Sequence, residues 1–203
     1  MNRILLIALV FLSTHVNSQT GLKDFFKLSG PKKSWVLKYP FKAKKVLEIS
    51  LDVKRISDSL KTSNLLDGDL NGGQLDAFRH AYWMARLKEE IGEAAARSLG
   101  KAHEKENYKT YKKNKLEDGV LPDKISTEMD LWNNEQGLKL VSKNGTTPKI
   151  GLIYRIVNAI HQGKMKVIKK DKNGNFLTCD GEIILKESLV GKWENKKCLL
   201  YSK

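Results

Sequence analysis

The segment from Gln74 to Ile91 constrains the fold most, because apolar residues surround nearly the whole circumference of the helix that it predicts. One face of this helix carries Trp83, Met84, Leu87 and Ile91, and the opposite side carries Phe78, Tyr82 and Ala85. A helix that is apolar on most sides is typical of the centre of a domain. We therefore expect a mainly α-helical bundle built around this segment.

Amphipathic spacing predicts further helices around the central one. They span residues 41–60, 93 to about 107, 127 to about 141, and 147–163. Thr127 with Asp130 is the expected capping box of the third, and Thr147 is the expected N-cap of the fourth. Between residues 165 and 203, Asn173-Gly174 separates short apolar runs. The expected fold is thus mainly α, with about five helices and a small C-terminal β-hairpin or meander.

Asp76 and His80 are the two polar residues that do not suit a buried helix. They are four residues apart and so lie about 40° from one another around the axis. Burying an unpaired carboxylate costs several kcal/mol. The pair must therefore be satisfied by each other, by a metal ion or by groups on other helices, and Arg79 is a further partner.

The two helices that follow also carry polar residues on faces expected to pack. His103 follows Leu99 on the face toward the central helix, so its ring is expected to approach His80. Glu104 points about 100° away and is expected to orient another group. On the next helix, a polar stripe stands where an apolar stripe is usual. It consists of Asp130, Asn133, Asn134 and Gly137. Gly137 would let a neighbour approach closely, although an exposed polar face is an alternative reading.

Helical bundles build metal and acid–base sites from carboxylate, imidazole and amide groups on facing helices, and three predicted helices carry such groups here. The candidate catalytic residues are Asp76, His80, His103, Glu104 and Asp130. The candidate ligands of a divalent metal ion are Asp76, His80, His103 and Asp130. The candidate substrate-binding residues are Arg79, Trp83, Asn133 and Asn134. A buried hydrogen-bond network without catalysis is the alternative.

Export is predicted from residues 1–18, which have a positive start, a short apolar stretch and small residues before a cut. Residues 19–203 are expected to form one domain, secreted or periplasmic, without a transmembrane segment. Cys179 and Cys198 are candidates for one disulfide in such a compartment. The formal net charge of +14 predicts attraction to an anionic polymer or envelope surface, without choosing between them.

The stretch from residue 64 to 73 combines Asp67-Gly68-Asp69 with Asn71-Gly72-Gly73. It is interpreted as a turn, because the bidentate Glu that closes a calcium loop is missing at the required place.

Three strings carry a resemblance that covers roughly residues 71–137, within a motif core of 71–141. They are DAFRHAYW from Asp76, AHE from Ala102 and MDLWNNEQG from Met129. In this order they resemble an uncharacterised domain family of secreted bacterial proteins, also found at the ends of polymorphic toxin chains. Trp132 stands where that family often has a histidine, which would remove a ligand or base. The resemblance implies no established reaction.

The leading hypothesis is a secreted hydrolase that acts on a polyanionic or cell-envelope substrate through His80 and His103, as bases or metal ligands. A zinc protease is disfavoured, because no second histidine follows His103-Glu104 at the required spacing. The alternatives are a non-catalytic secreted binding module, whose polar cluster is structural, and a toxin-type effector domain.

Overall fold

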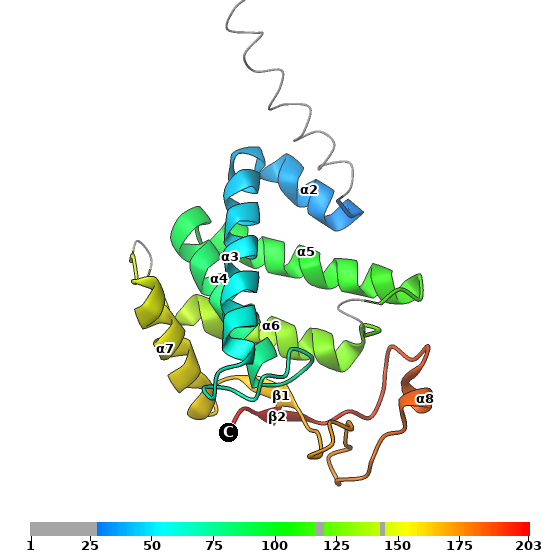
Figure 1. The fold of residues 1–203 in the computed structure, drawn as a ribbon. Coiled ribbons are helices and arrows are strands. Elements are labelled where there is room, and N and C mark those ends of the chain that lie inside the picture. The colour runs from blue at the N-terminus through cyan, green and yellow to red at the C-terminus, as the bar shows by residue number, and fades with distance from the viewer. Residues whose placement is uncertain (1–27, 117–119, 143–144) are drawn as a thin grey trace, which may run out of the picture.

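The computed structural model describes residues 28–116, 120–142 and 145–203, so the predicted signal peptide lies outside the described residues. The first helices in chain order are α2 (Gly30–Lys38), the 3-10 turn η1 (Pro40–Lys42), α3 (Ala43–Lys61) and α4 (Gln74–Ile91). They are followed by α5 (Glu93–Lys112), α6 (Lys124–Lys139), α7 (Lys149–His161) and the short α8 (Lys186–Leu189). The strands are β1 (Lys166–Ile168) and β2 (Leu199–Tyr201). The predicted mainly α fold with a small C-terminal β element is confirmed (Figure 1).

Helix α4 lies at the centre of the described fold and packs against α3, α5, α6 and α7. It begins and ends where its apolar pattern predicts. Its large side chains Phe78 and Tyr82 are fully buried, stack on one another, and belong to one continuous apolar cluster. Gly92 follows with a positive φ of 85°, which lets the chain turn sharply into α5.

Helix α6 packs on α4 with almost no space between the two backbones. A Cβ atom added to Gly137 would lie 2.2 Å from the carbonyl oxygen of Ala81 on α4. The glycine therefore permits the close approach that the sequence predicts, and it brings the polar face of α6 against α4.

The start of α6 differs from the prediction, which placed a capping box at Thr127 and Asp130. Asp123 is the N-cap, because its carboxylate accepts a hydrogen bond from the backbone N–H of Ser126 at 2.8 Å. Lys197 Nζ lies 2.5 Å from the other oxygen of Asp123, and both side chains are buried. The N-cap of α6 thus lies four residues earlier than predicted, and Asp130 does not serve as part of a capping box.

Two other helix ends also differ. Helix α5 continues beyond Asn107 to Lys112, because Tyr108 and Tyr111 pack against Trp193. Helix α7 begins after Pro148, without the side-chain cap expected from the preceding threonine.

The turn before α4 uses its acidic side chains for local structure. Asp67 accepts hydrogen bonds from the backbone N–H groups of Gln74 and Leu75, which are unpaired donors at the start of α4. Asp69 pairs with Lys170 at 2.5 Å. These contacts are those of the predicted turn.

The C-terminal β element pairs a strand that follows α7 with the last strand of the described chain. Strand β1 pairs antiparallel with β2, with Lys166 opposite Tyr201. The expected hairpin around Asn173-Gly174 is reduced to an isolated bridge between Lys170 and Phe176. A disulfide joins Cys179 to Cys198, which lies just before β2.

Candidate functional site

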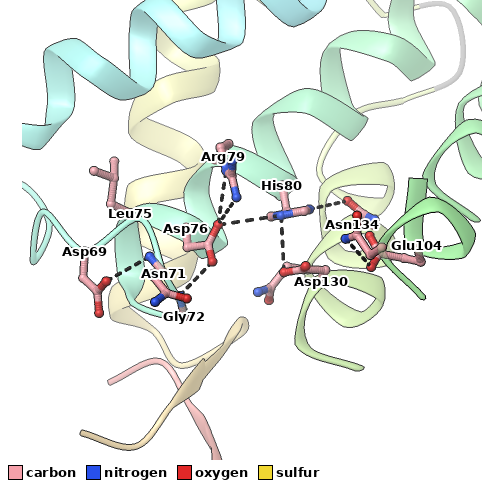
Figure 2. A network of polar contacts seen from close by, with 12 residues as sticks. Asp69, Asn71, Gly72, Leu75, Asp76, Arg79, His80, Glu104, Asp130 and Asn134 are labelled. Atoms are coloured by element: carbon pink, nitrogen blue, oxygen red, sulfur yellow. Dashed lines mark hydrogen bonds and ion pairs between the residues drawn. The ribbon is translucent and has the colours of Figure 1, made fainter. Parts of the chain in front are cut away.

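Asp76, His80 and Asp130 meet where α4 packs against α6 (Figure 2). Each of the three residues is less than 8% exposed. His80 Nε2 lies 3.3 Å from Asp130 Oδ1 and 3.7 Å from Asp76 Oδ1. The imidazole therefore stands between two buried carboxyl groups, one on its own helix and one on α6.

Asp76 is held in place by groups on both of its oxygens. The backbone N–H of Gly72 donates to Oδ2 at 2.8 Å, and Arg79 donates to Oδ1 through Nη2 at 2.7 Å and Nε at 3.2 Å. Burial raises the pKa of Asp76, although Arg79 and the Gly72 N–H oppose this effect by favouring the charged form.

His80 has its other ring nitrogen fixed by α6. Nδ1 lies 3.3 Å from Asn134 Oδ1, and an amide oxygen only accepts, so in this orientation of the amide Nδ1 carries the proton. Nε2 then presents its lone pair toward the two carboxyl groups, and this buried nitrogen makes no hydrogen bond. Burial lowers the pKa of His80 well below its usual range, and the nearby Arg79 and His103 lower it further.

These three residues fit the ligand set of a divalent metal ion. One atom from each of them lies within 4.8 Å of the other two. Two ligands about 2.1 Å from a tetrahedral ion lie about 3.4 Å apart, which is close to the distances from Nε2 to the two carboxyl oxygens. A neutral imidazole with carboxylates is a common donor set, and the hydrogen bond from Nδ1–H resembles the outer contacts that orient metal-bound histidines.

His103 approaches His80, as predicted, but does not belong to this three-residue group. The two ring centroids are 6.3 Å apart, and His103 meets the edge of Trp83 at 5.7 Å. His103 Nδ1 lies 3.9 Å from Glu106 on the same helix. His103 therefore stands beside the group, in a half-buried position.

Glu106 marks the outer end of this region. Burial alone would raise the pKa of its carboxyl group, but hydrogen bonds from His103, Lys32 and Ser29 hold that pKa at about 2. The residue is therefore ionised and ties α5 to α2 through Lys32.

Glu104 is buried on α5 and accepts a hydrogen bond from Asn107 Nδ2 at 3.2 Å. It lies one turn after Gly100, whose position packs against the amide of Asn134. Glu104 thus lies near Asn134, the residue that contacts His80, as Figure 2 shows. It is outside the three-residue group.

The residues expected to bind substrate have other contacts. Both ends of the Asn133 amide pair with the backbone of Lys166, at 2.9 Å each, so Asn133 holds β1 and does not present a binding group. Arg79 is engaged by Asp76, and Asn134 by His80. Trp83 Nε1 donates to the Ser50 hydroxyl at 3.1 Å. All four candidate substrate-binding residues therefore have partners within the described structure.

The departure at Trp132 removes no ligand from this group. Trp132 lies about 160° from Asp130 around the axis of α6. Its Nε1 donates to the Lys164 carbonyl oxygen at 3.2 Å, and its ring meets Tyr201 edge-on. A side chain at this position therefore points away from the three-residue group in this chain.

Gly72 is the member of the site that sequence reasoning missed. Its N–H donates to Asp76 because the turn before α4 folds back over the first helical turn. The Asn71-Gly72-Gly73 string was a signal for this turn but not for its contact with a buried carboxylate.

The fold and the site define a mainly helical protein with a buried His–carboxylate group at its central helix pair. The chain belongs to a family described as a domain of unknown function (DUF6973), whose sequence model matches residues 33–164. No curated protein and no solved structure shows a significant match. Among the described helices, none combines the length and apolar character needed to cross a membrane.

Proposed function

We propose that this chain is an exported hydrolase that uses a divalent metal ion held by Asp76, His80 and Asp130 to cleave a polyanionic or cell-envelope substrate. The observation that carries the proposal is the orientation of His80. Its unprotonated Nε2 is buried without a hydrogen bond and lies 3.3 and 3.7 Å from two carboxyl oxygens. A lone pair directed at carboxyl oxygens is repelled unless a cation or a carboxyl proton lies between them.

A divalent ion at this position would act as a Lewis acid and lower the pKa of a bound water. The chain supplies the rest of the arrangement. Asn134 fixes the tautomer and the ring plane of His80, while Arg79 and the Gly72 N–H fix the carboxyl group of Asp76. His103, half-buried beside His80, is a second imidazole placed to accept a proton from water.

Metal content and thermal unfolding test the metal site. The protein is purified without a polyhistidine tag and analysed for bound metal, and His80→Ala, His103→Ala and the control His161→Ala are compared. His161 lies outside the group and bonds the Leu65 carbonyl oxygen. We expect about one ion per chain in the wild type and in His161→Ala, loss of the ion in His80→Ala, and retention of the ion in His103→Ala, because His103 is not a ligand.

Added Zn²⁺ or Mn²⁺ at about 100 times its dissociation constant stabilises a folded site by about 2.7 kcal/mol, which raises the melting temperature by roughly 5–10 °C. EDTA should reverse this increase in the wild type and have no effect on His80→Ala. Wild-type protein that holds no ion and shows no response to metal or EDTA would refute the metal site.

Hydrolysis is tested separately with bis(4-nitrophenyl) phosphate in the presence of each metal. We expect turnover in the wild type, strong loss in His103→Ala despite retained metal, and full activity in His161→Ala. Bound metal without turnover of this or an envelope phosphodiester would leave the ion in place and contradict the hydrolase.

A structural hydrogen-bond network is the second candidate, and the Asn134 amide favours it. Asn134 Nδ2 is buried without a partner in its present orientation. An amide turned over would donate to Nδ1 of His80, and Nε2–H would then donate to Asp130. The ¹⁵N chemical shifts of His80 distinguish the two states, because they report which ring nitrogen carries the proton.

A further inference from the structure

A cleft with a volume of about 1040 Å³ lies between α2 and α5 and extends to α6 and Trp193. Figure 1 shows α2 beside one side of α5 and the C-terminal segment near the far end of α5. Asp76, His80 and Asp130 do not line this cleft. Glu104 forms part of its wall, so the cleft reaches the helix interface that holds the His80 group.

Positive charge follows the length of the cleft. Lys101, Lys105 and Lys109 are exposed, four residues apart on one face of α5, so successive lysines are spaced by about 6 Å. Lys38 faces them from α2. Within the described part of the chain, none of these four ammonium groups forms an ion pair with a carboxylate. Glu104 is the single acid among the lining residues, and it is buried, so the rim has a strong excess of positive charge.

Aromatic rings interleave with these lysines. Tyr108 is 40% exposed between Lys105 and Lys109, and Trp193 meets it edge-on with centroids 4.8 Å apart. Tyr111 stacks on Tyr108 with centroids 6.3 Å apart and also contacts Trp193 at 5.1 Å, so the three rings form one cluster. This arrangement keeps flat apolar faces fixed beside a row of cations.

We propose that this cleft binds single-stranded nucleic acid, with its phosphates along the lysines of α5 and its bases stacked on Tyr108 and Trp193. Rows of cations with interleaved aromatic rings bind single strands because every base has a face that stacks. A duplex keeps its bases paired inside the helix and offers only its phosphates. The role of the strand as substrate rests on the proposed function, whereas the binding itself requires no metal ion.

Fluorescence anisotropy with a labelled thymidine oligonucleotide of about 20 residues tests the proposal, in EDTA and over a salt series. The cleft variant carries Lys101→Gln, Lys105→Gln and Lys109→Gln. Its matched control carries Lys44→Gln, Lys61→Gln and Lys139→Gln, which remove the same charge from exposed lysines on α3 and α6. We expect the cleft variant to bind about 10-fold more weakly, with a salt slope lower by about 2, since each phosphate contact contributes about 0.7. The control should bind almost as the wild type does.

Stacking is tested with Tyr108→Leu, which keeps bulk but removes the ring, against Tyr154→Leu on α7. Tyr154 is 51% exposed and does not line the cleft. We expect about 5-fold weaker binding for Tyr108→Leu and no change for Tyr154→Leu.

Three outcomes would overturn the proposal. The first is equal weakening by the cleft and control lysine variants, which would reveal a nonspecific field. The second is duplex binding as tight as that of the single strand. The third is heparin binding with the same dependence on Tyr108, which would indicate an anionic glycan. Binding that persists in EDTA while all phosphodiesterase activity is absent would support the cleft and refute the hydrolase alone.

Discussion

Gly137→Ala tests whether the contact between α4 and α6 fixes the geometry of the His80 group. The added Cβ would lie 2.2 Å from the Ala81 carbonyl oxygen and 2.7 Å from the Ala81 Cα. Both neighbours are backbone atoms of a central helix and have no rotamer that moves them aside. The two helices must therefore separate by roughly 1 Å before the contacts become normal.

The magnitude follows from two opposing effects. Alanine is favoured over glycine in a helix by about 1 kcal/mol, whereas overpacking of a buried contact costs about 3 kcal/mol at the upper end of its usual range. The net loss in the free energy of unfolding is about 2 kcal/mol. Asp130 and Asn134 precede Gly137 on the same face of α6, so their separation from His80 increases as well.

Urea unfolding measures this loss, and Gly151→Ala on α7 is the control. A Cβ at Gly151 meets no atom within 4 Å, so the same substitution should leave stability unchanged or raise it by about 0.5 kcal/mol. Titration with Zn²⁺ should show weaker binding for Gly137→Ala and unchanged binding for Gly151→Ala. If both variants unfold at the same urea concentration, the reasoning about backbone contact is wrong.

Three further perturbations follow from the described contacts. Lys197→Met should lower the free energy of unfolding by about 3–5 kcal/mol, because it leaves Asp123 buried without its cation. A loss below about 1 kcal/mol in urea unfolding would contradict this expectation. The folded-state pKa of Glu106 is depressed to about 2, so its stabilisation is present above about pH 4.5 and is lost as the pH falls toward 2. Glu106→Gln should lower the free energy of unfolding at pH 7 by about 1–2 kcal/mol, after allowance for screening of this partly exposed side chain. It should also flatten the loss of stability at acidic pH, and an unchanged dependence of stability on pH would contradict a stabilising ion pair. Reduction of the Cys179–Cys198 bond should lower the free energy of unfolding by about 3 kcal/mol, measured by urea unfolding of the oxidised and the reduced protein. Equal urea midpoints for the two forms would show that the disulfide does not stabilise the fold.

The central helix could be predicted from sequence because its signals are local. The apolar residues of α4 surround its axis, and Gly92 stops it, so its bounds needed no tertiary information. The approach of His103 to His80 was also predictable, since adjacent helices in a hairpin pack through the faces on which both residues lie.

The rest depended on contacts between distant parts of the chain. Asp123 was not recognised as the cap of α6 because the lysine that stabilises it, Lys197, is 74 residues further on. Thr127 and Asp130 matched the local capping pattern equally well. The pairing of β1 with β2 likewise joins segments that no hairpin turn connects directly.

Asn133 illustrates why a polar stripe does not reveal its use. Its amide pairs with Lys166 as a neighbouring strand would, through one donor and one acceptor. The sequence shows an amide on an interior face, but a substrate and a strand backbone offer it the same groups. Only the observed position of β1 shows that the partner of Asn133 is a strand backbone and not a substrate.

Two consecutive asparagines on α6 thus connect structures that lie on different sides of this helix. Asn133 is bonded to the first residue of β1, and Asn134 is bonded to the imidazole of His80. The strand and the imidazole are therefore joined through two adjacent residues of the same helix. Cys198 lies next to β2, which pairs with β1, so a continuous series of covalent and hydrogen bonds runs from the disulfide to the ring of His80.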